Sequence, residues 1–363
     1  MPAAQEPKID CQSGNHEHGT GRVPRMGINA WKEIVSDFEK PCALRASWQL
    51  ISTLGCYLGT WVAIYFAMKV NYLVVLPLAL LASGFLVRLF IIFHDCCHNS
   101  FYKNKALNKW IGFFTGVLAF TPFKHWRWEH SVHHATAGDL DRRGVGDVWT
   151  LTVKEYIEMS RWDRFVYRMV RNPVILFVIA PSYVFLFRER WSSPRANPKT
   201  RKTVRLTNLA LLGMFLIGGL IFGFLQFVLI QVAIMAFAAS AGVWLFYIQH
   251  QFEGVYWERH EHWEYTSAAL EGSSFYRLPK ILQWFTGNIG YHHIHHLSSK
   301  VPNYYLEACH NSHPAFANVT TVTFWGGFKS LSFRLWDETD KMLVGWRRMR
   351  EIRRLKPANV VTG

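Results

Sequence analysis

The sequence predicts an all-α integral membrane protein with two transmembrane helical hairpins (four spans) and a helical cytosolic cap holding a histidine-rich di-metal site. Three observations predict this fold class. Two long stretches carry no charge, basic residues cluster around the apolar segments, and nine histidines fall in three tight groups. The chain of 363 residues is also 16% aromatic, with 16 tryptophans, which is typical of proteins that meet lipid.

The uncharged stretches set the number of spans. They cover 23 residues from Ala46 to Met68 and 47 residues from Leu206 to Phe252. Because a hydrocarbon core about 30 Å thick needs roughly 20 apolar helical residues, the first stretch is one span and the second is two. Val70 to Phe93 supplies another span, and Arg88 lies near its end, where its side chain can reach the interface. The predicted spans are therefore about 46–68, 70–93, 206–224 and 228–249.

Two shorter uncharged runs, Trp110 to Phe123 and Asn172 to Phe187, contain 14 and 16 residues. Each includes proline, and each is too short to cross a bilayer comfortably. We expect both to be interfacial or re-entrant.

Charge sets the orientation. The net charge is +15, but the basic residues surround the membrane segments, so an anionic membrane surface is a better partner than nucleic acid. The loops near residues 69–71 and 223–226 are short and carry a single charge. By the positive-inside rule, both termini and the cap face the cytosol.

The chain is expected to divide into a polar cytosolic N-terminal segment (1–45), a membrane domain (46–310) and a basic cytosolic C-terminal tail (311–363). Its six cysteines form no CxxC pair, which favours a reduced, cytosol-facing protein.

The chemistry lies in the three histidine groups. The chain has 17 histidines, and the groups are His94-Asp95-Cys96-Cys97-His98, His130-Ser131-Val132-His133-His134 and His292-His293-Ile294-His295-His296. Residues three or four apart share one face of a helix, so each group directs its imidazoles toward one point. The predicted metal ligands of these boxes are His94, His98, His130, His133, His134, His292, His295 and His296.

Eight nitrogens are too many for one metal ion, since zinc takes about four ligands, so the set indicates two metals with open positions. Imidazole suits zinc, copper, iron and nickel, and the ligand type alone does not choose among them. His293 falls off the shared face and is expected to be a neighbour or a hydrogen-bond donor behind the ligands. Six histidines outside the boxes lack this spacing and are expected at the surface: His16, His18, His260, His262, His310 and His313.

Nearby acids are candidates to accept the second N–H of a metal-bound imidazole, as carboxylates commonly do. The alternative for each is a solvated or helix-capping acid. The candidates are Asp95, Glu129, Asp139, Asp141, Asp147 and Glu253. The string His125-Trp126-Arg127-Trp128 could line a substrate tunnel, but an interfacial anchor is the preferred interpretation.

The strings HDCCHNSF, HSVHHATAGDLDRRG and GNIGYHHIHHLSSKVPNYYLE resemble those of membrane fatty acid desaturases, particularly the bacterial acyl-lipid type. The similarity covers roughly residues 80–310. The resemblance implies a non-haem centre of two iron ions and O2 as co-substrate. It also implies removal of two hydrogens from adjacent methylenes of a long acyl chain, which leaves a double bond and water.

The resemblance also suggests a ninth ligand, His250, at the cytosolic end of the fourth span. In stearoyl-CoA desaturases a histidine outside the boxes, at the corresponding span exit, completes the iron coordination. The alternative is an interfacial histidine hydrogen-bonded to Glu253 or to lipid head groups.

Two departures within the family bear on partners and substrate. The chain lacks the His-Pro-Gly-Gly string of a fused haem domain, so electrons are expected from a separate donor protein, ferredoxin-like or cytochrome b-type. Three residues separate the histidines of the first box, as in omega-6, omega-3 and bacterial acyl-lipid enzymes. This favours an acyl-lipid over an acyl-CoA substrate, omega-6/delta-12-like chemistry, and a bacterial inner membrane location.

Three alternatives remain open at this point. A hydroxylase or epoxidase shares the boxes. A histidine-rich metal transporter should place ligands at the bilayer midplane, where the long uncharged stretch has none. A membrane zinc hydrolase needs about three ligands and a carboxylate base, which leaves most of the histidines unexplained.

Overall fold

The computed structural model describes residues 26–194 and 196–355, so Cys11, His16, His18 and Lys356 lie outside the described residues. The fold is mostly helical. Its four long helices are α2 (Ala43–Val70), α3 (Val75–His98, preceded by the 3-10 turn η1, Tyr72–Val74), α9 (Pro198–Phe222) and α10 (Phe224–His250). All four are long and apolar enough to cross a membrane, as the sequence predicts.

The helices extend beyond the predicted spans because a helix does not stop where polar residues begin. α9 starts at Pro198, after an Asn197 side chain that caps the first turn, and not near residue 206. α9 and α10 are separated by Gly223 alone, whereas the predicted spans leave three residues between them. Gly223 has a φ of 86°, a conformation that glycine adopts at little cost, so one residue suffices to reverse the chain.

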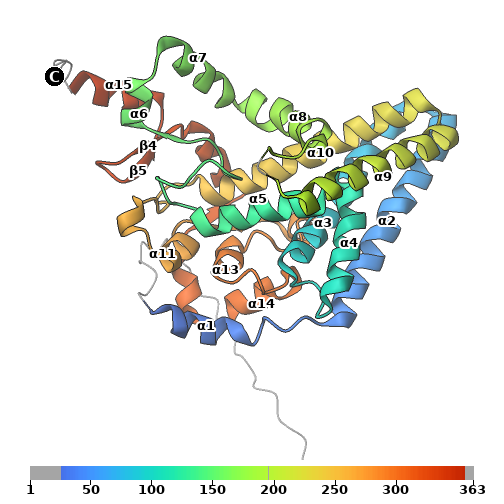
Figure 1. The fold of residues 1–363 in the computed structure, drawn as a ribbon, viewed down its shortest axis with the longest axis horizontal. Coiled ribbons are helices and arrows are strands. Elements are labelled where there is room, and N and C mark those ends of the chain that lie inside the picture. The colour runs from blue at the N-terminus through green and yellow to red at the C-terminus, as the bar shows by residue number, and fades with distance from the viewer. Residues whose placement is uncertain (1–25, 195, 356–363) are drawn as a thin grey trace, which may run out of the picture.

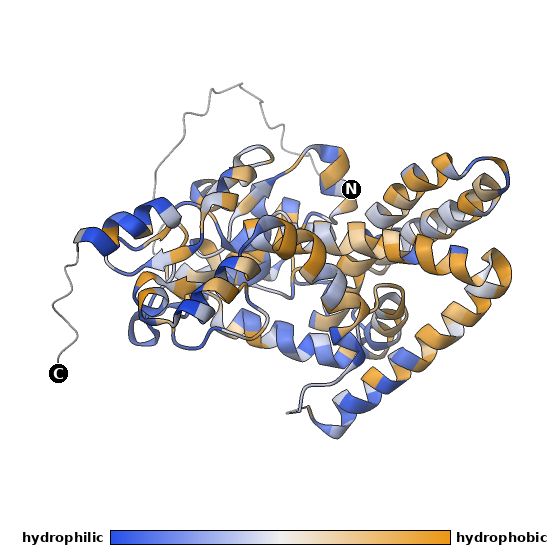
Figure 2. Ribbon diagram, turned by 90° about the horizontal axis from the view of Figure 1, so that it is seen from above, coloured by the Kyte–Doolittle hydropathy of each residue, from blue (hydrophilic) through white to orange (hydrophobic). Residues whose placement is uncertain are grey.

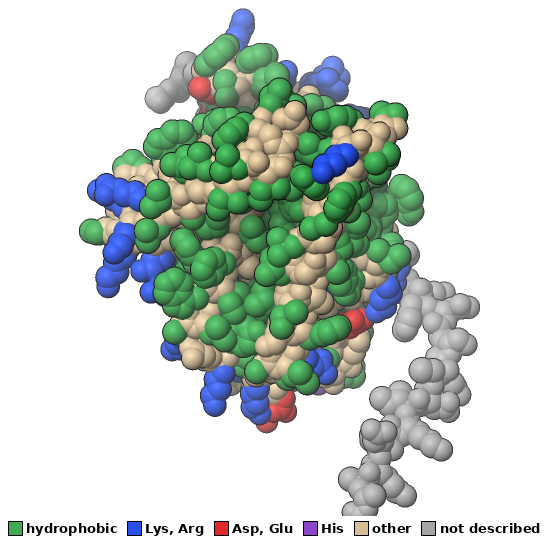
Figure 3. Space-filling model, turned by 90° about the vertical axis from the view of Figure 1, so that its right-hand side faces the viewer, with side chains coloured by type: hydrophobic (Ala, Val, Ile, Leu, Met, Phe, Trp, Pro, Cys, Tyr) green, Lys and Arg blue, Asp and Glu red, His purple; other side chains and the backbone are tan. Residues whose placement is uncertain are grey.

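Apolar and polar residues lie at opposite ends of the molecule. α3 packs against α2, α4 (Lys105–Leu118) and α10, and the long helices meet at the right of Figure 1. Figure 2 shows that these helices are hydrophobic and that the other end is mainly hydrophilic. Figure 3 shows a surface of mostly hydrophobic side chains at the helical end, with lysine and arginine at its edges. Exposed residues such as Leu58, Phe66 and Leu220 contribute to the apolar surface of these helices.

The rest of the chain forms short elements around the ends of α3 and α10. The helices are α1 (Ile28–Ser36), α5 (Phe123–Thr136), α6 (Val153–Glu158), α7 (Arg161–Val170), α8 (Ala180–Leu186), α11 (Tyr265–Leu270), α12 (Lys280–Phe285), α13 (His292–Leu297), α14 (Leu306–Asn311) and α15 (Trp346–Leu355). A π-helical turn, η2 (Ile175–Ile179), precedes α8, and 3-10 turns are η3 (Arg188–Arg190), η4 (His260–His262), η5 (Asn303–Tyr305), η6 (Pro314–Asn318) and η7 (Gly326–Ser332).

The expectation of an all-α protein is wrong in detail, because five short strands are present. β1 (Leu151–Thr152) is parallel to β4 (Leu335–Asp337), which is antiparallel to β5 (Met342–Val344). β2 (Phe275–Arg277) is parallel to β3 (Thr321–Thr323). Strands of two or three residues give too short an alternation for the sequence to reveal them.

The predicted domain boundary at residue 310 stays a prediction, although residues beyond it pack on those before it. β3 and β4 pair with β2 and β1, and Trp336 is fully buried. At the other end of the chain, Trp31 of α1 packs against Phe316, with ring centroids 5.3 Å apart.

The two short apolar runs take different forms. Residues 110–123 are mostly in α4, which packs against α3, α5 and α9. Residues 175–190 form a helical segment bent by 60° from α7, as in a broken span or a re-entrant loop. The Arg88 side chain, expected to reach the interface, turns toward α12. Its guanidinium lies 4.1 Å from the centre of the Trp284 ring and donates to the Trp284 carbonyl, because α12 packs against α3.

Candidate metal centre

Four helices present the nine predicted ligands. α3 carries His94 and His98, one turn apart, and ends directly after the box at Asn99, whose left-handed φ of 57° terminates the helix. α5 carries the second box and α13 the third. His250 is the last residue of α10, so all four helices bring histidines to one buried region.

The first histidine group, hereafter the five-histidine group, joins all three boxes. Its members are His94, His98, His130, His134 and His295, whose candidate ligand atoms lie within 4.8 Å of one another. The Nε2 atoms of His94 and His130 are 3.0 Å apart, those of His130 and His134 are 3.0 Å apart, and those of His134 and His295 are 2.9 Å apart. Such spacing suits nitrogens that each lie about 2.0–2.1 Å from one metal ion, as in zinc-bound imidazoles.

The second group, hereafter the four-histidine group, contains His133, His250, His292 and His296. The Nε2 atom of His250 lies 3.2 Å from that of His133 and 3.0 Å from that of His292. The Nε2 atoms of His292 and His296 are 3.1 Å apart. The two groups adjoin, since the rings of His134 and His296 stack at 4.3 Å.

Burial disfavours the protonated form of five box imidazoles on the short helices α5 and α13. Burial, reinforced by the surrounding histidines, lowers the pKa of His130, His134 and His295 well below the usual range. The same causes lower the pKa of His292 and His296. A neutral imidazole keeps a lone pair for a metal, so the chemistry of this donor set fits two metal ions.

Groups behind the rings fix their orientation. The His133 Nδ1 lies 2.6 Å from the Asp147 carboxylate, and the His250 Nδ1 lies 3.1 Å from the Gly272 carbonyl oxygen. The His94 Nδ1 lies 3.1 Å from Asp95. With Nδ1 donating to these acceptors, Nε2 is left unprotonated and faces the group.

Two of the six acids predicted behind the rings, Asp95 and Asp147, therefore contact box histidines. The other four do not, because each is bound elsewhere: Glu129 to Arg188, Asp139 to Arg142 and His260, Asp141 to Arg259, and Glu253 to Lys329. No sequence pattern indicated Asn303, whose backbone and side-chain N–H groups donate to Asp95 at 2.7 and 2.8 Å.

The expectation that His310 is a surface residue is wrong. Its Nδ1 lies 3.0 Å from the Nε2 of His293, which is fully buried and belongs to neither histidine group. Burial lowers the pKa of His310 to about 4. His313 is half-buried and accepts a hydrogen bond from the Ala315 N–H, whereas His260 and His262 are exposed. His293 is thus a neighbour of the site, as its position off the shared face predicts.

The interfacial-anchor interpretation of residues 125–128 is wrong for its first two residues. Trp126 stacks on the His130 ring at 4.3 Å, and His125 is buried against Glu189, with Nδ1 and carboxylate oxygen 3.3 Å apart. His125, Glu129 and Glu189 could together hold a metal ion, but Arg188 already pairs with both carboxylates. The Ser193 N–H also donates to the His125 Nε2 at 3.3 Å, so this trio serves as an ion-pair network.

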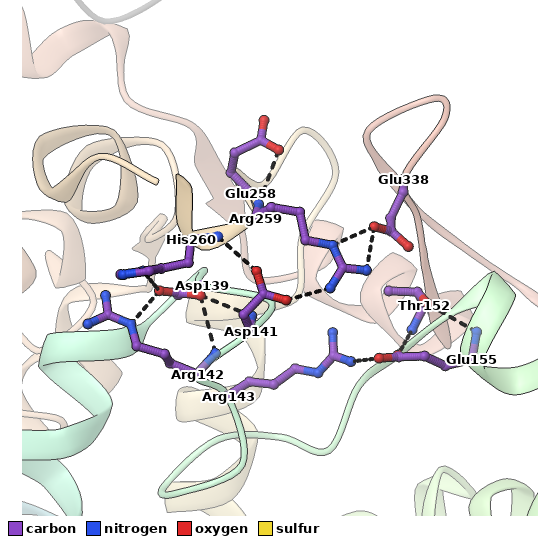
Figure 4. A network of polar contacts seen from close by, with 10 residues as sticks. All are labelled: Asp139, Asp141, Arg142, Arg143, Thr152, Glu155, Glu258, Arg259, His260 and Glu338. Carbon is purple, nitrogen blue, oxygen red and sulfur yellow. Dashed lines mark hydrogen bonds and ion pairs between the residues drawn. The ribbon is translucent and has the colours of Figure 1, made fainter. Parts of the chain in front are cut away.

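Figure 4 shows a network of ion pairs and hydrogen bonds around Asp139, Asp141 and Arg259. Asp139 lines the same cavity as His133 and His250, so the network lies beside the four-histidine group. Arg259 pairs with Asp141 at 2.5 Å and with Glu338 at 2.7 Å, and His260 pairs with Asp139 at 2.8 Å. The network ties the loop after the second box to the segment after α10. Between it and the histidines lies a cavity of about 20 Å³, which His133, His250 and Asp147 help to line. A cavity of this size holds about one water molecule.

The helical fold and the buried histidines define a class of metalloprotein built on helices that are long and apolar enough to cross a membrane. The profile of the "Fatty acid desaturase" family matches residues 70–327. The chain belongs to the fatty acid desaturase family and is therefore an oxidoreductase.

Individual relatives agree with this assignment. A Bacillus subtilis (strain 168) protein named "Fatty acid desaturase" is 49% identical over 318 residues, which is 88% of this chain and 90% of the relative. A Synechocystis "sn-1 acyl-lipid omega-3 desaturase (ferredoxin)" is 28% identical over 60% of this chain and 61% of its own length. An Anabaena variabilis "sn-1 oleoyl-lipid 12-desaturase" is 22% identical over 77% of this chain and 81% of its own length.

Proposed function

We propose that this protein uses O2 to introduce a double bond into a long acyl chain of a membrane lipid, and that the nine histidines hold two iron ions. The observation that carries the proposal is the convergence of nine imidazoles in two adjoining groups of five and four. Iron, when bound, supplies the redox chemistry that an unactivated C–H bond requires, since no acid or base can act on such a bond. The protein contributes neutral ligands, their fixed orientation and burial.

The proposed substrate is an acyl-lipid rather than an acyl-CoA, with omega-6/delta-12-like chemistry. The three-residue spacing between His94 and His98 supports this choice, as do the names of the cyanobacterial relatives, which are acyl-lipid omega-3 and 12-desaturases. The electron donor is proposed to be a separate protein of the ferredoxin or cytochrome b type. The name of the Synechocystis relative, which specifies ferredoxin, supports the first of these.

We also propose that the protein spans a bacterial inner membrane four times, with both termini and all three boxes cytosolic. The second and third boxes contribute to the same two groups, so an even number of crossings separates residue 134 from residue 292. α9 and α10 supply two crossings. Reporter tags near residues 140 and 300 should therefore report the same side, and opposite sides would refute this topology.

The decisive experiment is expression in a bacterium that lacks the product, followed by fatty acid analysis with double-bond positions mapped. A new double bond at the omega-6 or delta-12 position supports the whole proposal. A new bond elsewhere refutes only the proposed position, and a hydroxylated chain identifies a hydroxylase.

Metal analysis of the purified protein tests the cofactor separately. About two irons per chain are expected, because nine ligands exceed what one ion takes. A single zinc ion would refute the di-iron centre and favour a hydrolase.

A further inference from the structure

Five arginines line a groove of about 330 Å³ between α7 and α15, which none of the nine predicted ligands lines. The arginines are Arg161, Arg164, Arg168, Arg350 and Arg353. The other lining residues are Tyr156, Ile157, Phe165 and Met349, so no lining residue is acidic. A groove of this size matches the volume of small-ligand pockets, and its polar groups carry one sign of charge.

No carboxylate among the described residues pairs with any of these five arginines. Within residues 26–194 and 196–355, the side chains of Arg161, Arg164, Arg350 and Arg353 form no ion pair. The neighbouring Glu351 is occupied by Arg347 and Arg348 on the other side of α15. Positive charges held together without a counterion lower their mutual repulsion when they bind an anion.

The fifth arginine is fixed in place. The Arg168 Nε donates to the Tyr156 hydroxyl at 2.7 Å, and its guanidinium lies 5.5 Å from the centre of the Trp346 ring. Trp346 belongs to α15, so Arg168 ties the two walls of the groove together. An anion therefore meets at least one donor that is already oriented, which reduces the entropy lost on binding.

An apolar surface continues from the groove. Trp162, Phe165 and Met169 are 69%, 52% and 41% exposed and recur along one side of α7. Val178 and Tyr183, which follow α7 along the chain, are exposed as well. A short helix with apolar residues on one side and arginines beside them is typical of segments that lie in a membrane interface.

We propose that the groove binds the phosphate of an anionic phospholipid head group while the apolar side of α7 lies in the lipid interface. Guanidinium groups match phosphate oxygens through paired hydrogen bonds, and Phe165 belongs both to the groove and to the apolar surface. An acidic protein partner would account for the arginines but not for exposed Trp162 and Met169. The inference rests on the membrane location proposed above, but not on the reaction.

The test is native mass spectrometry of the full chain in zwitterionic detergent, titrated with phosphatidylglycerol or with phosphatidylcholine of the same acyl chains. The variant Arg164→Gln/Arg353→Gln removes two groove charges. The control Lys154→Gln/Arg354→Gln removes two exposed charges that do not line the groove. Arg161→Gln/Arg350→Gln provides a second groove variant, and iron content and elution volume check that each variant folds.

Wild type and control should bind phosphatidylglycerol in preference to phosphatidylcholine, and each groove variant should bind phosphatidylglycerol roughly 20-fold more weakly. Equal binding by all variants overturns the proposal, as does an equal loss in the control. Displacement of the lipid by millimolar inorganic phosphate would show a free-anion site instead. If the groove variants bind lipid as wild type does but no longer accept electrons from an acidic donor protein, the groove binds a protein and the proposal is wrong.

The experiments separate a wrong assignment of the groove from a wrong assignment of the reaction, because lipid binding is measured without turnover. Normal desaturation with equal lipid binding by all variants refutes the groove alone. Selective lipid binding without any new double bond refutes the reaction alone.

Discussion

The two histidine groups differ in how they are built. The four-histidine group has two rings held from behind, by Asp147 and by the Gly272 carbonyl, and a cavity adjoins it. In the five-histidine group one ring contacts a carboxylate, that of Asp95. Each group also has a buried ring nitrogen without a hydrogen-bond partner among the described residues, Nε2 of His98 and Nδ1 of His292. Because the four-histidine group has one candidate ligand fewer, we expect it to tolerate the loss of a ligand less well than the five-histidine group.

The largest expected effect comes from the four-histidine group. His292→Ala should reduce turnover below about 1% of wild type, because outer hydrogen-bond partners alone typically contribute 10–100-fold and a direct ligand contributes more. Iron should fall below the wild-type content, because the variant removes one of the four candidate ligands of this group. Both are measured on protein purified in parallel with wild type. Near-normal product would remove His292 from the set of ligands.

Replacing a member of the larger group sharpens the comparison. His98→Ala should also abolish turnover, but it leaves four imidazoles, so iron should be retained better than in His292→Ala. The measurement is iron per chain after dialysis against a weak chelator. An equal loss from both variants would show that the two groups do not differ in this way.

His250 tests whether α10 contributes a ligand. Its Nε2 lies within 3.2 Å of two box histidines, so His250→Ala should reduce both iron content and activity, because a methyl group cannot fill the vacated position. The alternative, an interfacial histidine paired with Glu253, is not supported by the contacts, since Glu253 pairs with Lys329. Wild-type iron and retained desaturation in this variant would nevertheless exclude His250 as a ligand.

Substitution of the acids behind the rings should reduce activity less than substitution of the histidines. Asp147→Asn preserves the shape but removes the charge that orients His133, so activity or metal affinity should fall about 10–100-fold. Asp141→Asn is the matched control, because Asp141 lies in the same loop and contacts Arg259 rather than a box histidine. Equal losses of activity in the two variants would mean that the fold of this loop matters and the Asp147–His133 contact does not.

The smallest effect is expected at exposed histidines. His260→Ala should keep at least about half of wild-type activity, because His260 is exposed and buried Asp139 keeps its ion pair with Arg142 when the imidazole is removed. Product yield and thermal unfolding temperature check this expectation. Loss of iron from this variant would show that the network in Figure 4 supports the metal groups.

The histidine boxes could be predicted because their spacing is local: on a helix, residues three and four apart share a face whatever the rest of the fold does. The acids could not be predicted in the same way. Asp95 and Glu129 each lie next to a box histidine in the chain, yet only Asp95 contacts its neighbour. The Glu129 carboxylate pairs instead with Arg188, which is close only in the folded protein. Asn303 and Gly272 reach the site only through tertiary packing, and neither carries a sequence signal.

The length of α10 has a mechanical consequence. Its 27 residues extend about 40 Å at 1.5 Å per residue, which exceeds a hydrocarbon core of about 30 Å. Such a helix accommodates thinner or thicker bilayers by changing its tilt. His250 is the last residue of this helix, so a change in tilt displaces its ring relative to His133 and His292. Under the proposed topology, we therefore expect the geometry of the four-histidine group to respond to the thickness of the surrounding bilayer, the physical property that a product with a new double bond would itself change.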